Sequence, residues 1–414
     1  MKTIVLGAGI VGVTSAYFLA KAGDDVTVLD RRPGVALETS FANAGLVAPG
    51  HSYTWASPRA PTILLKSLFR EGQALRLKLT ADWHMWAWCW LFLRNCTEER
   101  SRLNTSRKVR LCRYSQAQLQ ALTAAEQLAY ERISRGLIYL YRDEAALARG
   151  IANMSILTDN GLRLETLTPQ TAIEREPALA AARDRLAGAI YCPTDESGDA
   201  HLFAKALYER CIALGVTFQF DTDIWGASAS AERIERIETS RGPVQGDRYV
   251  LALGSYSPFL ARKLGYRLPV YPVKGYSVTL PIEPSHRPPD IGGVDEHNLV
   301  AWARFGNRLR CTATAEISGY DTRHTPADFT HMLQTARDLF PNGADYSRPT
   351  YWAGLRPMTP GGTPLIGATR HRNFFLNTGH GHMGWTMSCG TARLLADTMH
   401  GRTPELDMTG LTLS

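Results

Sequence analysis

Several features of nucleic-acid-binding and fibrous proteins are absent from this 414-residue sequence. It has no long basic run, no zinc-finger spacing and no aromatic-basic RNA-binding pattern, which argues against a nucleic-acid partner. Internal repeats, low-complexity tracts and long linkers are also missing. Hydrophobic residues make up 44% and charged residues 21% of the chain, the balance of a soluble globular protein. This composition excludes a disordered, collagen-like or multi-span membrane protein, and the length allows two domains.

Cysteine pairs with the spacing of a redox or metal motif are absent too. The seven cysteines are odd in number, include no CxxC and lie mostly in apolar or helical-looking sequence. We therefore predict small buried thiols in a reducing compartment, with neither a disulfide framework nor a metal site.

A strong excess of one charge is also lacking. Lys and Arg number 46 against 39 Asp and Glu, a formal charge of +7 that suits an anionic cofactor, an anionic substrate or an acidic membrane surface. The apolar run after Lys2 resembles a signal peptide, but three glycines interrupt it and no small-residue cleavage site follows. We expect a cytoplasmic mature N-terminus.

The N-terminal residues predict a β-α-β unit. A short apolar strand at residues 3–6 is followed by a helical pattern at 11–22, and a second strand at 26–29 ends at Asp30. The turn between the first strand and the helix has the pattern GxGxxG, with glycines at positions 7, 9 and 12. Such a turn brings a pyrophosphate close to the helix N-terminus, and an acid at the end of the second strand accepts hydrogen bonds from ribose. The unit therefore predicts dinucleotide binding, without deciding between NAD and FAD.

The remaining sequence predicts a second domain inserted into the first. Residues 62–150 have a mostly helical pattern, and strand patterns follow at 215–220 and 249–253. Polar and apolar residues alternate at 270–280 and 308–317, as in antiparallel strands. A final strand at 373–377 and a helix ending near Met399 resemble the strand and helix of the N-terminal unit. We therefore expect the N-terminal and C-terminal segments to form one domain.

Four segments resemble the D-amino acid oxidase superfamily, and within it the bacterial D-amino acid dehydrogenase small subunits. The resemblance is colinear over nearly the whole chain. The segments that carry it are Glu38-Thr-Ser-Phe-Ala-Asn-Ala-Gly45, Val273-Lys-Gly275, Gly354-Leu-Arg-Pro-Met-Thr-Pro360 and Asn377-Thr-Gly-His-Gly-His-Met-Gly-Trp-Thr-Met-Ser-Cys-Gly390.

The resemblance implies an α/β fold with α+β elements. A discontinuous Rossmann-like FAD-binding domain would comprise residues 1–60, 150–260 and 350–414. The inserted substrate domain, built on an antiparallel sheet, would comprise 61–149 and 261–349. The implied reaction oxidises a D-amino acid through an imino acid to a 2-oxo acid and ammonia, and dehydrogenases of the family pass the electrons to a quinone or another acceptor.

The glycine motif and the resemblance together predict a set of FAD-contacting residues. A helix N-terminus near Gly384 would favour negative charge on the reduced flavin. The predicted cofactor residues are Gly7, Gly9, Ile10, Val11, Gly12, Asp30, Arg31, Ser40, Asn43, Ala44, Gly45, Ile224, Gly254, Gly354, Gly379, Gly381, His382, Met383, Gly384, Trp385 and Thr386.

Arg356 is the predicted substrate residue, because a guanidinium can hold a substrate carboxylate by two parallel hydrogen bonds. The matching arginine has this role in the family. Tyr276 and Tyr53 are further candidates for carboxylate binding, with core or sheet-surface positions as the alternative. His51 and His382 either line the substrate cavity or are structural histidines. No general base is evident, and we expect direct hydride transfer from Cα to flavin N5, which needs only a neutral substrate amine.

Two positions depart from the family pattern. The expected Thr-Pro-Asp-Gly turn has Gly361 in place of the acid. His382 stands where related dehydrogenases usually carry a smaller residue and glycine oxidase-like members carry a larger basic one. The second departure leaves the substrate open. The first reading is a D-amino acid dehydrogenase. The alternatives are an amine or imino-acid oxidase or dehydrogenase acting on glycine, sarcosine or a D-hydroxyproline-type substrate, and a non-catalytic flavin-binding subunit.

Residues 83–93 contain four tryptophans and are strongly apolar, but they are too few to span a bilayer. We predict a buried helix. The alternative is a membrane-interface helix on the cytoplasmic face of the inner membrane, which would bring the flavin near its quinone acceptor. The oligomeric state is not predicted.

Overall fold

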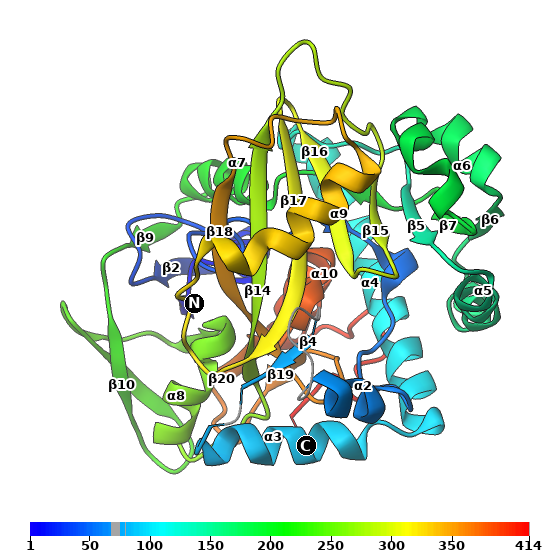
Figure 1. Cartoon of the computed structure of the whole chain (residues 1–414). Helices are drawn as coiled ribbons and strands as arrows, with labels where there is room; N and C mark the ends of the chain where they lie inside the picture. Colours follow the sequence, from blue (N-terminus) through cyan, green and yellow to red (C-terminus); the bar gives the residue numbers. More distant parts are fainter. Residues whose placement is uncertain (68–74, 79, 414) are drawn as a thin grey trace.

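The N-terminal β-α-β unit begins a six-stranded sheet in the computed structural model, which describes residues 1–67, 75–78 and 80–413 (Figure 1). The sheet has the strand order β19-β20-β13-β1-β2-β9, and all neighbouring pairs are parallel except β19 with β20. Its strands are β1 (Lys2–Leu6), β2 (Asp25–Leu29), β9 (Thr217–Gln219), β13 (Arg248–Leu251), β19 (Leu365–Ala368) and β20 (Phe374–Thr378).

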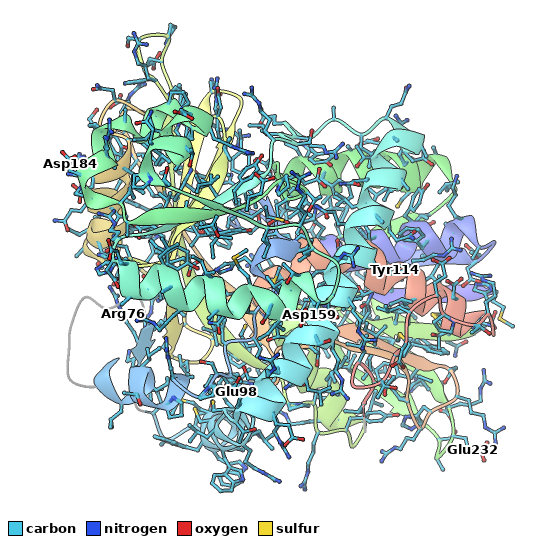
Figure 2. The ribbon with its side chains drawn as sticks, turned by 90° about the vertical axis from the view of Figure 1, so that its right-hand side faces the viewer. Arg76, Glu98, Tyr114, Asp159, Asp184 and Glu232 are labelled. Atoms are coloured by element: carbon cyan, nitrogen blue, oxygen red, sulfur yellow. The ribbon has the colours of Figure 1, made fainter. Side chains whose placement is uncertain are left out.

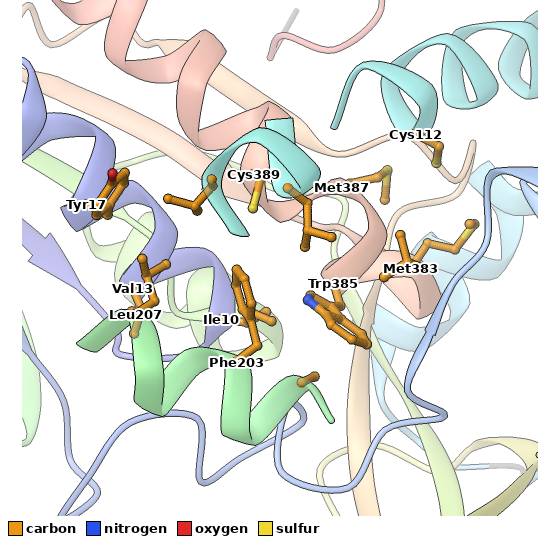
Figure 3. Packing of buried hydrophobic residues seen from close by; sticks show 14 of the residues in the cluster. Ile10, Val13, Tyr17, Cys112, Phe203, Leu207, Met383, Trp385, Met387 and Cys389 are labelled. Carbon is orange, nitrogen blue, oxygen red and sulfur yellow. The ribbon is translucent and has the colours of Figure 1, made fainter. Parts of the chain in front are cut away.

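Three helices cover one face of this sheet: α1 (Ile10–Lys21), α7 (Ala200–Ala213) and α10 (Gly384–Met399). Their apolar side chains form one core with Val5 of β1. Figure 3 shows Val13 of α1 beside Leu207 of α7, and Met387 and Cys389 of α10 belong to the same cluster. This packing fixes the N-terminal ends of α1 and α10 relative to the sheet edge.

The opposite face of the sheet packs on a small antiparallel sheet of β10 (Ile224–Ala229), β11 (Ile234–Thr239) and β12 (Gly242–Val244). Ile4 and Leu6 point into this second core, whereas Val5 between them points into the helical core. The two-residue period of a strand accounts for this division, and it explains why β1 is apolar on both faces.

The second part of the molecule is built on a larger, nine-stranded sheet. Its strand order is β18-β14-β17-β16-β15-β5-β7-β6, and β4 pairs with β17. Helix α9 (Thr330–Leu339) lies against it in Figure 1, and its apolar side packs on β16 and β17. The strands are β4 (Leu75–Leu77), β5 (Leu137–Tyr141), β6 (Glu165–Leu167), β7 (Gly188–Cys192), β14 (Tyr271–Pro281), β15 (Gly292–Asp295), β16 (Val300–Phe305), β17 (Arg308–Ile317) and β18 (Thr350–Met358).

The long helix α4 (Glu98–Glu126) packs along α10. In Figure 2 it rises from Glu98 and passes Tyr114 beside α10. A two-stranded pair, β3 (Leu46–Val47) with β8 (Glu196–Ser197), lies nearby. The remaining α-helices are α2 (Ala60–Ser67), α3 (Trp83–Arg94), α5 (Glu144–Thr158), α6 (Pro169–Arg175) and α8 (Ser257–Lys263), and the 3-10 helices are η1 (Pro49–His51), η2 (Pro177–Arg185), η3 (Gly254–Tyr256), η4 (Pro326–Phe329) and η5 (Gly381–Met383).

The predicted fold class is confirmed, whereas sheet membership divides the chain differently from the predicted domain ranges. Strands β6 and β7 fall in the segment 150–260 but pair in the larger sheet, as does β18 from the segment 350–414. Helix α4, from the segment 61–149, packs on α10. The mostly helical pattern predicted for 62–150 also misses β5, a short apolar run that periodicity alone does not distinguish from helix. Residues 68–74 and 79 of that prediction lie outside the described residues.

Helix α3 corrects the prediction of a buried tryptophan helix. Only Trp88 of its four tryptophans is buried, at 5% exposure, where its Nε1 donates to the carbonyl oxygen of Met358. Trp83, Trp86 and Trp90 are exposed by 73%, 44% and 64%. At 100° per residue these three share one side of the helix, opposite Trp88. Helix α3 is therefore amphipathic and lies on the surface.

Candidate functional site

A cavity of about 620 Å³ separates the two sheet systems. One wall consists of the turns that follow β1, β2, β13 and β20, at the carboxyl ends of the parallel strands. The other wall comes from β14, β17 and β18 of the larger sheet. Ligands of open α/β sheets bind at this strand edge.

The glycine turn after β1 brings the N-terminus of α1 to the cavity. Gly9 and Ile10 line the cavity, and the backbone N–H of Ile10 donates to Oγ of Ser40 at 3.3 Å. A Cβ on Gly12 would lie 1.8 Å from the carbonyl oxygen of Gly7, so only glycine permits this close packing. A Cβ on Gly9 would meet nothing closer than 3.9 Å, which leaves its surface open for a phosphate group.

Asp30 fixes the geometry of the turn at the end of β2. Its Oδ2 accepts the backbone N–H of Ala8 at 2.6 Å, and its Oδ1 accepts that of Arg32 at 2.8 Å. Burial raises the pKa of Asp30, although these two donors favour the carboxylate. Arg31 stacks over the ring of Tyr256, with 3.9 Å between the guanidinium carbon and the ring centroid. This end of the cavity therefore presents a carboxylate, a cation and an aromatic ring.

The other end of the cavity is formed by η5 and the start of α10. Met383, at the N-cap position of α10, provides no side-chain cap, so the first backbone N–H groups of the helix lack a side-chain acceptor there. Two buried polar atoms of cavity-lining residues have no hydrogen-bond partner in the described part of the protein: Nε1 of Trp385 and Oδ1 of Asn377. Unpaired buried polar atoms are rare and costly in proteins, so their presence fits a bound polar cofactor. Together with the glycine turn and Asp30, these residues fit FAD.

Arg356 on β18 lines the cavity and lacks a carboxylate partner. Its Nη1 donates to the carbonyl oxygens of Thr314 at 2.9 Å and Lys274 at 3.4 Å. In the described part of the chain no Asp or Glu pairs with it, and burial lowers its pKa to about 10. Its guanidinium carbon lies 5.8 Å from the ring centroid of Trp55. An arginine at this pKa is cationic at neutral pH, so the cavity offers an unneutralised positive charge to an anion.

Strand β18 is held rigidly next to Arg356. The carbonyl oxygen of Leu355 accepts hydrogen bonds from the hydroxyls of Thr39, at 2.7 Å, and Ser255, at 3.0 Å. These donors come from the loop after β2 and from η3, on the side of the six-stranded sheet. The guanidinium is thus positioned by both sheet systems.

His382 of η5 forms a second wall at this end of the cavity. Its ring stacks on Trp55 with 4.6 Å between centroids and an interplanar angle of 18°. Its Nε2 lies 3.4 Å from Nζ of Lys108, a lysine of α4 that is only 1% exposed. Burial, together with the neighbouring cations Lys108 and Arg356, lowers the pKa of His382 well below its ordinary value. His382 is therefore a neutral imidazole at physiological pH.

His51 of η1 also lines the cavity, where its Nε2 lies 2.6 Å from Oε1 of Glu296. Although burial disfavours the charged ring, Glu296 raises the pKa of His51 above its ordinary value. The ring stacks on Tyr139, with 5.1 Å between centroids. The Tyr139 hydroxyl in turn donates to Asp195, whose pKa burial raises to about 6.

The two candidate tyrosines are placed differently. Tyr276 lines the cavity, but its hydroxyl donates to Oε2 of Glu316 at 2.7 Å, which engages its single proton. Tyr53 is not among the cavity-lining residues, and its backbone carbonyl oxygen accepts from Nζ of Lys108 at 3.1 Å. Contact of either tyrosine with a substrate stays a prediction.

Most of the predicted cofactor residues line one cavity, although their individual roles stay predictions. Gly12 and Gly379 are not among the lining residues. Those that line it are Gly7, Gly9, Ile10, Val11, Asp30, Arg31, Ser40, Asn43, Ala44, Gly45, Ile224, Gly254, Gly354, Gly381, His382, Met383, Gly384, Trp385 and Thr386.

Sequence reasoning missed three side chains of the site: Trp55, Lys108 and Glu296. Trp55 follows His51 and Tyr53 at intervals of two residues, and this run of aromatic residues could have identified Trp55 as a further candidate for the cavity wall. Lys108 is one of many basic residues in its helix, and Glu296 lies more than two hundred residues from His51. Nothing in the local sequence distinguishes these two.

Comparisons with known proteins identify the family of the chain. The family described as FAD dependent oxidoreductase matches residues 2–398. The chain is 44% identical over 412 residues to D-amino acid dehydrogenase 2 of Mesorhizobium japonicum, covering 99% of each protein. It is 46% identical over 413 residues to D-amino acid dehydrogenase of Bradyrhizobium diazoefficiens, covering 100% of this chain and 98% of that protein.

Solved structures with low sequence identity share the fold. Glycine oxidase from Geobacillus kaustophilus superposes with a TM-score of 0.78 at 22% identity, covering 100% of this chain and 98% of that one. L-proline dehydrogenase from P. horikoshii gives a TM-score of 0.75 at 17% identity, covering 100% and 96%. At these identities the likeness describes the fold alone.

Proposed function

Because the chain belongs to the family of FAD-dependent oxidoreductases, with FAD as its cofactor, we propose that it oxidises D-amino acids to 2-oxo acids and ammonia. The observation that carries the proposal is Arg356, a cation on the cavity wall whose hydrogen-bond partners among the described residues are all backbone carbonyls. An amino acid brings the carboxylate that this cation lacks. The names of the full-length relatives support the D-amino acid as the substrate class.

FAD, when bound, would supply the acceptor for the hydride that leaves Cα. The protein's own contribution is binding and orientation. Arg356 would hold the carboxylate by two parallel hydrogen bonds, which orients Cα towards the cofactor. The stacked rings of Trp55 and His382 would close the cavity beside Arg356 and exclude water.

The predicted cofactor residues would hold FAD along the cavity. The open surface of Gly9 and the N–H groups of α1 would receive the pyrophosphate, and Asp30 the adenosine ribose. The uncapped start of α10 would favour negative charge on the reduced cofactor. The domain division into an FAD-binding and a substrate-binding part remains part of this proposal.

A product assay tests the proposal. Purified holoenzyme is incubated with D-alanine and a dye acceptor, and pyruvate and ammonia are measured, with L-alanine, glycine, sarcosine and D-hydroxyproline in parallel. We expect equal amounts of both products from D-alanine and little from the L-enantiomer. Turnover of only glycine, sarcosine or the cyclic imino acid would replace the substrate class. Absence of product from all five would favour a non-catalytic flavin-binding subunit.

We further propose that the electrons pass to a quinone, with α3 docked on an anionic membrane surface. Trp83, Trp86 and Trp90 are exposed on one side of α3, and the neighbouring helix α2 exposes Ile63 and Leu65. Helices α2 and α3 pack in one hydrophobic cluster, so these residues belong to one region of the surface (Figure 1). Exposed tryptophans of an amphipathic helix suit the lipid interface. No helix in the described part of the chain is long and apolar enough to span a membrane.

Flotation with vesicles of phosphatidylethanolamine and phosphatidylglycerol tests this attachment. We expect the wild type to float with the vesicles and a variant with Trp83, Trp86 and Trp90 all replaced by Ser to remain below. Trp225→Ser is the matched control, because Trp225 is 59% exposed and belongs to β10, not to α2 or α3. A wild type that does not float, or a triple variant that floats equally well, would contradict the docking proposal. Faster reoxidation of the reduced enzyme by a soluble quinone than by air would support the acceptor.

A further inference from the structure

Lys108 of α4 is a buried lysine that the proposed reaction does not otherwise use. Its Nζ donates to the carbonyl oxygen of Tyr53 at 3.1 Å and lies 3.4 Å from Nε2 of His382. In the described part of the chain no carboxylate pairs with it, and burial lowers its pKa to about 8. At neutral pH an unneutralised ammonium group therefore lies directly behind His382.

This contact selects one form of the His382 ring. An ammonium group has protons to donate and no lone pair, so Nε2 of His382 must accept and the ring proton resides on Nδ1. A second proton would place a third positive charge beside Lys108 and Arg356. The same two cations, together with burial, lower the pKa of His382.

The other titratable groups around the pair leave this positive charge in place. Burial raises the pKa of Cys112, one turn along α4 from Lys108, to about 12, so its thiol is neutral. Asp195, whose pKa is about 6, is a carboxylate at neutral pH, but it accepts from the Tyr139 hydroxyl and the backbone N–H of Gly50, and among the described residues it forms no ion pair with Lys108. Among the described residues, Arg356 on β18 has no carboxylate partner and His51 on η1 is bound to Glu296. Burial raises the pKa of the Tyr53 hydroxyl, which is therefore neutral.

We propose that Lys108 is a positioning residue which, through His382 and alongside Arg356, makes the cavity bind its amino-acid substrate as an anion with a free amine. The inference rests on the proposed function and identifies the protonation state of its substrate. A zwitterion would add an ammonium group near two unpaired cations, which is unfavourable, whereas a carboxylate is favoured. The N–H bond breaks on binding, the proton passes to bulk water and the electron pair stays on nitrogen. This provides the neutral amine that hydride transfer requires, without a general base.

Substitution of Lys108 tests the inference through the pH profile. Lys108→Met removes the charge with little change in side-chain length, and Lys108→Arg retains it. The limiting rate of flavin reduction at saturating D-alanine, measured anaerobically, reports the pKa of the bound amine. We expect the rising limb of this profile to move to higher pH by about one unit in Lys108→Met and to stay near the wild-type position in Lys108→Arg. A rate that falls equally at every pH, with the limb unmoved, would indicate a merely structural lysine and overturn the inference.

Nitrogen-15 NMR of histidine-labelled protein tests the same pair without turnover, and His382→Gln assigns the signal. We expect wild-type His382 to carry its proton on Nδ1, with Nε2 unprotonated, near pH 7, where Lys108 is still an ammonium group. Lys108→Met should place a proton on Nε2 in part of the molecules. A wild-type ring protonated at Nε2 would contradict the inference. A wild type that no amino acid reduces would instead overturn the proposed function, and the NMR result would still decide the Lys108–His382 pairing.

Discussion

Nη1 of Arg356 donates a hydrogen bond to the carbonyl oxygen of Thr314 at 2.9 Å, and Thr314 itself has a positive φ of 61°. The two residues lie on β18 and β17, on either side of β14. The β14–β17 register shifts here: Lys274 pairs with Glu316 and Tyr276 pairs with Ala313, so Thr314 and Ala315 together oppose Gly275. Such a bulge redirects backbone groups. Here it presents the carbonyl oxygen of Thr314 to Arg356, which pairs with no carboxylate in the described part of the chain.

Thr314 is strained, because a β-branched residue rarely adopts a left-handed conformation. We expect Thr314→Gly to be more stable than Thr314→Ala by about 1 kcal/mol, since only alanine retains the Cβ that makes this conformation costly. Chemical denaturation of the two variants measures the difference. At an ordinary strand position alanine would be the more stable of the two, and that order would contradict the assignment of strain.

Arg356→Met should lower kcat/KM for D-alanine by about 10²- to 10⁴-fold, the loss of two charge-assisted hydrogen bonds. Arg356→Lys keeps the charge but not the paired donors, so we expect an intermediate loss. Steady-state kinetics with a dye acceptor gives both values. Ethylamine, which lacks the carboxylate, is the matched substrate, and its slow oxidation should not change. An equal loss with both substrates would show that Arg356 does not bind the carboxylate.

Gly9 and Gly12 should respond differently to replacement by alanine. Gly9→Ala has room for its Cβ in the protein, so we expect a folded variant with weakened FAD binding, because the methyl group occupies the proposed pyrophosphate surface. Gly12→Ala would place its Cβ 1.8 Å from the carbonyl oxygen of Gly7, and we expect a loss of stability as well. Thermal denaturation of the apoproteins and FAD titration separate the two effects. Equal loss of stability in both apoproteins would contradict the distinction.

Glu296→Gln should change the pH dependence of stability through His51. Glu296 raises the pKa of His51 in the folded protein, so their interaction stabilises the fold below about pH 6.5, the ordinary histidine value, and this contribution is lost as the pH rises through the folded pKa. The free energy of unfolding of the variant should therefore fall below that of the wild type near pH 6 by up to about 1 kcal/mol, the usual size of a partly exposed ion pair. The difference should shrink as the pH rises through the pKa of His51 in the folded protein. Urea denaturation at a series of pH values measures it. A difference that grows with rising pH would contradict the charged pair.

The local signals of the sequence predicted the dinucleotide end of the molecule well. The predicted strand at 26–29 and helix at 11–22 correspond to β2 and α1 within one residue at each end, and the helix from Gly384 to Met399 is α10. Glycines, an apolar period and a capping acid are all contained in about thirty consecutive residues, so they can be read without knowledge of the partners. The family and its FAD cofactor are confirmed by comparison.

The substrate side was harder to predict, because its determinants come from distant segments. Strand β5 is defined by its pairing with β7 and β15, about fifty and more than one hundred and fifty residues away, and not by its own short apolar run. The exposure of Trp83 and Trp90 depends on which side of α3 packs on the protein. Lys108 acquires its significance only because α4 places it against His382, 274 residues later in the chain.

Anaerobic reduction of the purified holoenzyme by D-alanine tests the central claim most directly, with L-alanine and Arg356→Met as references. The account predicts rapid loss of the yellow flavin absorbance with D-alanine, little change with L-alanine, and a strongly weakened response in Arg356→Met at equal FAD content. A wild type whose flavin stays oxidised with D-alanine, or a variant that is reduced as readily as the wild type, would contradict it.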